Sequence, residues 1–366
     1  MPNRSTCQTT MIGSMPHGSA EAALTALSAY ALTIPAWPQL PQRSFVEGMI
    51  LQSSEGFPGV RIDPVRHKVW VQRDDGLPEA MAAFYENVLT DKDEAMAMSE
   101  DGSPGLHAFL RQLEHATDLP SAVKGQITGP LTFALGLADQ ERRAVWFDEE
   151  YRDVVLKGLA MKARWQVGQL KRHAEHVLLF LDEPILSALG TPAYMGIDAT
   201  QVSDALKEVI RAAQAAGAMV GVHCCGNMDW ELLAGTGLDI MAFDAYAYGE
   251  KVALYPEAIQ GFLERGGTLA YGLIPTSDPE DILRETPKSL VERLRTLQEL
   301  LVRKGIGEDL VYRRLLLTPA CGMGMMSILQ SEHVLELLAE TRAWAEAEYT
   351  SPGGLFDSTK GSVNKA

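Results

Sequence analysis

The stretch MVGVHCC, residues 219–225, joins a run of apolar and β-branched residues to one histidine and two cysteines. A short apolar run of this kind, bounded by polar residues, is typical of a buried β-strand. Side chains two positions apart on a strand point to the same side, so His223 and Cys225 can face one point while Cys224 faces away. The expected strand therefore ends in two side chains that suit a soft metal ion.

Seven further stretches have the same form, a short apolar run that ends in Gly, Pro or a polar residue. They are residues 9–14, 32–37, 122–129, 176–184, 239–245, 268–275 and 315–321. The segments between many of them carry apolar residues at helical spacing, as in residues 200–217. Alternating strands and helices predict an α/β protein with a parallel sheet, and eight strands are the number that closes a TIM (β/α)8 barrel. Two Rossmann-like halves are the alternative, but neither half shows a Gly-rich phosphate-binding motif after its first strand.

The connection between the second and third expected strands is about 85 residues long. Connections of this length are uncommon, so this one predicts an insertion with structure of its own, in which residues 60–76 form a hairpin. We expect residues 1–350 to form a single barrel domain. Residues 351–366 are polar and contain glycine, which predicts a poorly ordered tail.

The chain of 366 residues has 32 basic and 48 acidic side chains, a net charge of −16. This charge disfavours nucleic acids and anionic membranes as partners. The apolar runs are shorter than the roughly 20 residues that a membrane span needs. Four cysteines do not make a disulfide framework, and together these features predict a cytoplasmic protein whose clustered Cys and His residues are ligands or nucleophiles.

Cys321 ends the last expected strand and is followed by Gly322 and Gly324, which permit a close backbone path around a ligand. Closure of the barrel would bring Cys321 to His223 and Cys225. One nitrogen and two sulfur donors suit Zn²⁺ better than oxygen-loving ions. The alternative is that these residues belong to the core, because cysteine often behaves as a small hydrophobic residue. Their position at strand ends favours the zinc site.

Several motifs resemble a known superfamily of barrel enzymes. It joins uroporphyrinogen decarboxylase, cobalamin-independent methionine synthase and the methylcobalamin:coenzyme M methyltransferases, and the resemblance covers roughly residues 8–330. The motifs are TTMIGSMPH (9–17), GQITGPLTF (125–133), FLDEPILSALG (180–190), and HCC (223–225) with ACGMG (320–324). The last pair matches the HxC…C zinc signature of the methyltransferase branches.

The resemblance implies that His223, Cys225 and Cys321 bind zinc. In these relatives the fourth ligand is a glutamate about twenty residues after the HxC cysteine. Asp244, which lies 19 residues after Cys225, best fills that place here.

The resemblance also implies where a thiol substrate binds. Ile12, Gly13 and Ser14 match the segment that holds the amino acid part of homocysteine, and Asp182 matches the residue that contacts its amine. Glu47 matches an acidic substrate contact. An acceptor that carries an ammonium group, such as homocysteine, is therefore favoured.

Two departures narrow the expected activity. The decarboxylase branch uses an N-terminal segment rich in arginine, whereas residues 10–50 contain only Arg43. Full-length methionine synthase is a double barrel and this chain is a single one, so the methyl donor is expected to be a methylcorrinoid, free or on a separate corrinoid protein, rather than a folate. We expect a zinc-dependent thiol methyltransferase. The alternatives are a decarboxylase-like lyase and a non-catalytic barrel that binds a corrinoid or a partner.

Overall fold

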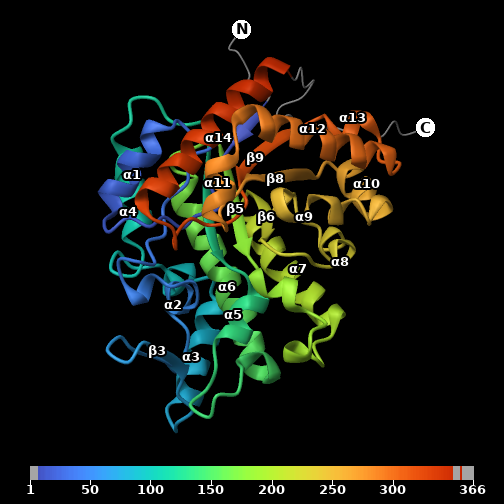
Figure 1. Cartoon of the computed structure of the whole chain (residues 1–366). Coiled ribbons are helices and arrows are strands. Elements are labelled where there is room, and N and C mark those ends of the chain that lie inside the picture. The colour runs from blue at the N-terminus through green and yellow to red at the C-terminus, as the bar shows by residue number, and fades with distance from the viewer. Residues whose placement is uncertain (1–6, 349–354, 357–366) are drawn as a thin grey trace, which may run out of the picture.

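The computed structural model describes residues 7–348 and 355–356. Seven parallel strands form one curled sheet with helices around it, in the order β1-β9-β8-β7-β6-β5-β4 (Figure 1). The strands are Cys7–Thr9 (β1), Ala122–Thr128 (β4), His176–Asp182 (β5), Ala218–Cys224 (β6), Ile240–Phe243 (β7), Thr268–Ile274 (β8) and Leu315–Pro319 (β9). The prediction of an α/β protein with a parallel sheet is confirmed.

The expected second strand, residues 32–37, is not a regular strand. Ala36 makes a single parallel bridge to Lys124, and the Lys124 N–H donates to the carbonyl of Pro35 over 2.8 Å. The other side of this segment makes backbone hydrogen bonds to the first strand and the residues after it. Pro35 and Pro38 lack N–H donors, so a continuous ladder cannot form here. The regular sheet therefore has seven strands, and the complete eight-stranded barrel stays a prediction.

The inner face of the curled sheet is apolar near the strand starts. Its core consists of Ile12, Ile34, Ala122, Leu178, Phe180, Ile240, Ala242, Ala270, Leu316 and Leu355. Gly221 makes room in this core, because a Cβ at this position would lie 2.6 Å from the Phe180 ring. Further along several strands the same face carries polar residues, such as Asp182 after Phe180 on β5 and Asp244 after Ala242 at the end of β7. The packing therefore leaves the carboxyl ends of the strands for chemistry.

Two residues of the expected tail belong to this inner core. Leu355 is 4% exposed and packs in the core, and the ring of Phe356 stacks on His176 with 4.3 Å between centroids. His176 begins β5, so both residues cover the amino ends of the strands. Leu355 is buried and Phe356 is half-buried in these contacts; the other residues of 351–366 lie outside the described part, and the poorly ordered tail stays a prediction.

The helices pack on the outer face of the sheet over a large apolar core. They are Ala20–Ala29 (α1), Pro104–Glu114 (α4), Pro130–Gly136 (α5), Glu149–Leu170 (α6), Ala199–Ala215 (α7), Trp230–Ala234 (α8), Ala245–Val252 (α9), Pro256–Glu264 (α10), Pro279–Arg284 (α11), Pro287–Arg303 (α12), Glu308–Val311 (α13) and Ile328–Glu348 (α14). Among the described residues, no helix combines the length and the apolar character that crossing a membrane requires.

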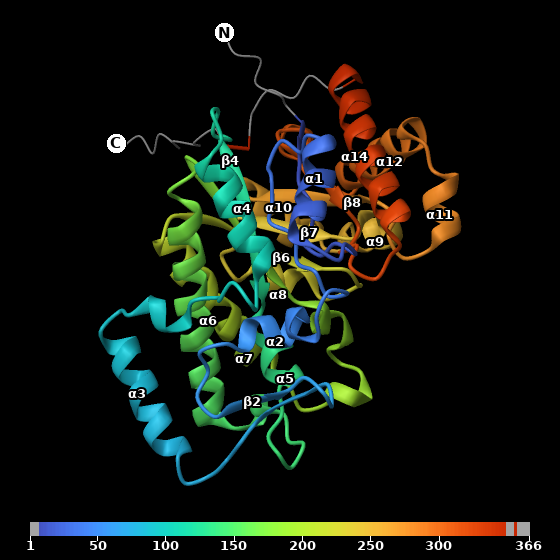
Figure 2. The same ribbon diagram turned by 90° about the vertical axis from the view of Figure 1, so that its left-hand side faces the viewer.

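The insertion after the second expected strand has the predicted hairpin. Met49–Ser54 (α2) is followed by the antiparallel pair Val60–Asp63 (β2) and Lys68–Val71 (β3), and then by Leu77–Leu89 (α3). Figure 2 shows the hairpin and α3 at the end of the molecule that lies opposite α1 and α14. Just after the hairpin, Arg73 binds Asp139 over 3.0 Å, which ties the insertion to the segment between β4 and α6.

Candidate metal centre

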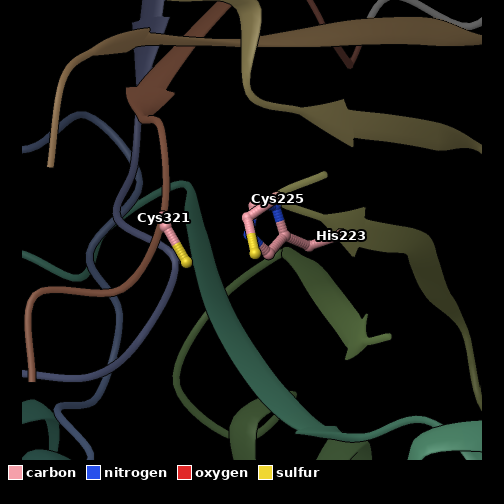
Figure 3. A group of neighbouring side chains, drawn as sticks. All are labelled: His223, Cys225 and Cys321. Atoms are coloured by element: carbon pink, nitrogen blue, oxygen red, sulfur yellow. The ribbon is translucent and has the colours of Figure 1, made fainter. Parts of the chain in front are cut away.

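Two separate strands deliver the three side chains of the candidate metal centre. His223 lies on β6, Cys225 directly follows that strand, and Cys321 follows β9 by two residues. One ligand atom of each residue lies within 4.8 Å of the others. Figure 3 shows the Cys321 sulfur pointing across the carboxyl end of the sheet towards Cys225 and His223. The structure thus brings together residues that are 96 positions apart in the sequence (321 − 225 = 96).

The loop that carries Cys321 rests on Ser14. The Ser14 Oγ accepts a hydrogen bond from the Gly324 N–H over 3.0 Å, and the Ser14 carbonyl accepts one from Met323 over 2.9 Å. A Cβ at Gly322 would overlap the Ser14 Oγ, so only glycine permits this approach. Ser14, expected to contact substrate, therefore also fixes the backbone beside Cys321.

The chemistry of the three donors fits a zinc ion. His223 is 3% exposed, and neither ring nitrogen has a hydrogen-bond partner within the described part of the chain. A buried imidazole without partners is costly, and a coordinate bond to a metal would satisfy one of its nitrogens. The neighbouring Cys321 thiol and the His223 ring lower the pKa of Cys225, whereas hydrogen bonding to Cys225 and burial raise the pKa of Cys321. Of the two thiols, Cys225 therefore loses its proton more readily.

Asp182 ends β5 directly beside His223 on β6. It is 4% exposed, and its Oδ1 has no partner among the residues that the structure describes. Burial raises the pKa of Asp182 to about 6, although the charges of Lys124 and His223 oppose this shift. A buried carboxylate oxygen without a donor is suited to accept a hydrogen bond from a ligand.

Lys124 is a buried charged residue on β4 that was not among the predicted site residues. Its ammonium group is completely buried and donates to the Ile12 carbonyl over 2.6 Å and to the Gln126 Oε1 over 3.0 Å. It also lies 4.6 Å from the centre of the Phe180 ring. Alternation along residues 122–129 places Lys124 and Gln126 on one face, and this signal could have found it.

Asp244 lies near the three residues but outside their group. Its Oδ1 accepts a hydrogen bond from the Ala247 N–H over 2.8 Å, which caps α9. Burial raises the pKa of Asp244 to about 6, and the charge of Cys225 adds to this effect. The sequence predicted a strand over residues 239–245, so a helix that begins at Ala245 and is capped by Asp244 was not expected.

The remaining predicted site residues have defined contacts. Ile12 presents its carbonyl to Lys124, and the Gly13 Cα lies so close to Gln126 that an added Cβ would be 2.9 Å from the Gln126 Cδ. Glu47 is 1% exposed and paired with Arg43, whereas its Oε2 has no partner in the described ranges. Ile12 and Gly13 therefore lie against the interior of the sheet, and Glu47 presents one oxygen without a donor.

Glu183 has a structural role that its sequence neighbours do not reveal. It is completely buried and accepts hydrogen bonds from the Leu131 and Thr132 N–H groups, both over 2.8 Å, and from the Thr132 hydroxyl over 2.6 Å. These donors open α5, so Glu183 joins the end of β5 to the start of that helix. Both oxygens of its carboxylate therefore accept hydrogen bonds from the start of this helix.

Comparison with known proteins supports the fold. No family profile and no curated protein matches the chain. Among solved structures, a protein provisionally described as a vitamin B12-independent methionine synthase from Listeria monocytogenes is 14% identical, with a TM-score of 0.55 over 90% of this chain and 85% of that one. A methyltransferase from Methanosarcina mazei is also 14% identical, with a TM-score of 0.53 over 93% of this chain and 94% of that one. At this identity the likeness is one of fold.

Proposed function

We propose that the protein is a zinc-dependent methyltransferase that moves a methyl group to a thiol, in the zinc branch of the superfamily named above. The observation that carries the proposal is the convergence of His223, Cys225 and Cys321, whose ligand atoms lie within 4.8 Å of one another at the carboxyl ends of the strands. In a closed barrel this end is the active-site face. The irregular segment around Ala36, which bridges to β4, supports closure into a full TIM barrel with an insertion.

The donor set defines the chemistry. A free thiol is mostly protonated at neutral pH, and zinc, when bound, would lower its pKa so that the sulfur attacks as a thiolate. Cys225 and Cys321 would contribute negative charge to the site, which keeps a further sulfur nucleophilic. Asp244 is the proposed fourth ligand. Its carboxyl group is buried near Cys225 and His223, whose charges shift its pKa.

The acceptor is proposed to be homocysteine or a similar amino thiol. The unpartnered Asp182 Oδ1 would accept a hydrogen bond from the ammonium group, and Ser14 would contact the amino acid part together with the Ile12 and Gly13 backbone. Glu47 offers a second acidic contact. The acceptor sulfur then forms a bond to the methyl carbon, while the bond from that carbon to the donor breaks and its electron pair stays with the donor.

The donor is proposed to be a methylcorrinoid, free or on a partner protein, with a methylated folate as the second choice. Reduced cysteines at such a site suit a cytoplasmic location. A decarboxylase-like lyase would not require two cysteine ligands, and a purely binding barrel would show no turnover.

The test is a methyl-transfer assay with the zinc-loaded protein. Methylcobalamin and 5-methyltetrahydrofolate are each incubated with homocysteine, and methionine and the demethylated donor are quantified. We expect turnover that falls at least about 100-fold in Cys225→Ala and Cys321→Ala, because the loss of one ligand disrupts the site. Undiminished transfer in either variant, or none in the wild type with either donor, would contradict the proposal.

A further inference from the structure

Lys124 on β4 connects this strand to the segment after β1, which in turn contacts the loop that carries Cys321. Its ammonium group donates to the Ile12 carbonyl and to the Gln126 side chain, and the Gln126 amide donates to the Trp37 carbonyl over 3.0 Å. The Ile12 carbonyl is thus fixed to β4, although Ile12 follows β1 at the far edge of the seven-stranded sheet. This buried side chain thus adds a direct contact between the two edges, beside the segment at residues 32–37 that bridges them.

Residues 12–14 link Lys124 to the loop that carries Cys321. Two residues after Ile12, Ser14 accepts hydrogen bonds from Gly324 and Met323 in the loop after β9. Between them the backbone at Gly13 lies directly against Gln126, so that an added Cβ would be 2.9 Å from the Gln126 Cδ. Lys124 and Gln126 therefore form the surface on which residues 12–14 rest.

The buried ammonium group of Lys124 lies close to a carboxylate and an aromatic ring. Burial lowers the pKa of Lys124, while the Asp182 carboxylate opposes this shift and the Phe180 ring faces the ammonium group. The hydrogen bonds of Lys124 go to the Ile12 carbonyl and the Gln126 side chain.

We propose that Lys124 is a positioning residue for the metal centre, which holds the Ile12–Ser14 segment so that the loop after β9 presents Cys321 to His223 and Cys225. This inference rests on the proposed function, because it assumes that the three residues bind zinc. Lys124 itself acts only through Ile12 and Ser14.

The test compares zinc affinity in variants of the full chain by competition with a chromophoric chelator. Lys124→Met removes the donors and the charge but keeps a flexible chain of similar length. We expect zinc affinity to fall roughly 10- to 100-fold, as is typical when the support of a metal ligand is lost. Lys124→Gln, which keeps an N–H donor, should lose less and provides a second variant if the methionine variant folds poorly.

A matched control distinguishes positioning from general stability. Lys162 is a second completely buried lysine, and it donates to the carbonyls of Glu55 and Met96 over 3.0 and 2.8 Å, away from the three ligands. Lys162→Met should lower the thermal midpoint but leave zinc affinity unchanged. Equal losses of zinc affinity in Lys124→Met and Lys162→Met would overturn the inference.

Cobalt substitution reads the geometry directly. In the Co²⁺ form, the sulfur-to-cobalt charge-transfer band reports the number of thiolate ligands, and Lys124→Met should weaken this band through the loss of Cys321. In a double-mutant cycle, Ser14→Ala should add little to Lys124→Met, because both changes act on one path. Additive effects, or an unchanged band, would refute the role of Lys124, whereas a wild type that binds no zinc would refute the proposed function instead.

Discussion

Cys224 and Cys225 are neighbours in the chain but have opposite environments. Cys224 is completely buried in the outer core, and burial raises the pKa of its thiol to about 12. Cys225 lies in the group with His223 and Cys321, where its pKa is lowered. This difference follows from the alternation of side chains along a strand.

The pair provides a matched test at the level of single residues. Cys225→Ala should abolish tight zinc binding, because it removes one of the sulfur donors. Cys224→Ala should retain one equivalent of zinc and lose only some stability, about 1 kcal/mol for a small cavity. Metal analysis after gel filtration measures both outcomes, and zinc loss in Cys224→Ala alone would reverse the assignment.

Residue patterns in the sequence revealed only part of the site. The spacing of His223 and Cys225 predicted a shared side, because side-chain alternation is a local property. The roles of Lys124 and Glu183 depend on partners far away in the sequence, Ile12 after β1 for the first and Thr132 in α5 for the second. Local sequence does not specify such partners.

The loop after β9 depends on the close approach of its backbone at Gly322 to the Ser14 side chain. Gly322→Ala would place a methyl group onto the Ser14 Oγ and should displace Cys321, so zinc affinity should fall. Ser14→Ala removes that oxygen and should restore much of the affinity when combined with Gly322→Ala. A double variant that binds zinc more weakly than Gly322→Ala would show that this overlap is not the cause.

Asp139 ties the insertion to the segment between β4 and α6, and it makes a pH-dependent contribution to stability. Burial alone would raise the pKa of Asp139, but hydrogen bonds from Arg143 and Glu141 and the charge of Arg143 lower it below the ordinary value. Arg73 donates to the same carboxylate over 3.0 Å. Because the folded-state pKa is lowered, the stabilisation is complete above the unfolded-state pKa, near 3.9, and is lost as pH falls through the folded-state value.

Asp139→Asn should therefore lower the free energy of unfolding by about 1 to 2 kcal/mol at pH 7. The difference should shrink as pH falls below about 4, because the wild-type carboxylate becomes protonated as well. Urea unfolding across this pH range measures the effect, with the exposed Asp75→Asn as the control. A difference that does not change with pH would show that charge is not the cause.

Six of the eight expected strands match regular strands of the sheet to within a residue or two at each end, because their apolar runs are buried on both faces. The first, residues 9–14, overlaps β1 (Cys7–Thr9) only at Thr9. The expected second strand, residues 32–37, has the same apolar character, but it contains Pro35 and is followed by Pro38. The pattern of hydrophobicity cannot by itself reveal which backbone donors a ladder needs. The hairpin at residues 60–76 was predictable because its alternation is local.

In the whole molecule, both ends of the sheet interior are occupied, but by different means. The carboxyl ends carry the candidate metal centre, and the amino ends are covered by Leu355 and Phe356. The polar composition of residues 351–366 concealed this contact, because two apolar residues are a weak signal within a polar segment. The distant tail therefore contributes to the same core as the strands.

This packing has a measurable consequence. Leu355→Ala should lower the free energy of unfolding by about 2 kcal/mol, at the lower end of the range for buried leucines. Phe356→Ala should act in the same direction through the lost stack on His176. Zinc affinity should not change, since the contact lies at the opposite ends of the strands. Chemical denaturation tests this, and wild-type stability in both variants would contradict the contact.

The most direct test of the account is X-ray absorption at the zinc edge of the purified, zinc-loaded protein. The account predicts one zinc per chain with two sulfur ligands at about 2.3 Å and a histidine nitrogen at about 2.0 Å. It also predicts that one sulfur is lost in Cys321→Ala. A zinc ion surrounded only by nitrogen and oxygen, or a sulfur count that Cys321→Ala does not change, would contradict the central claim that these three side chains form a metal centre.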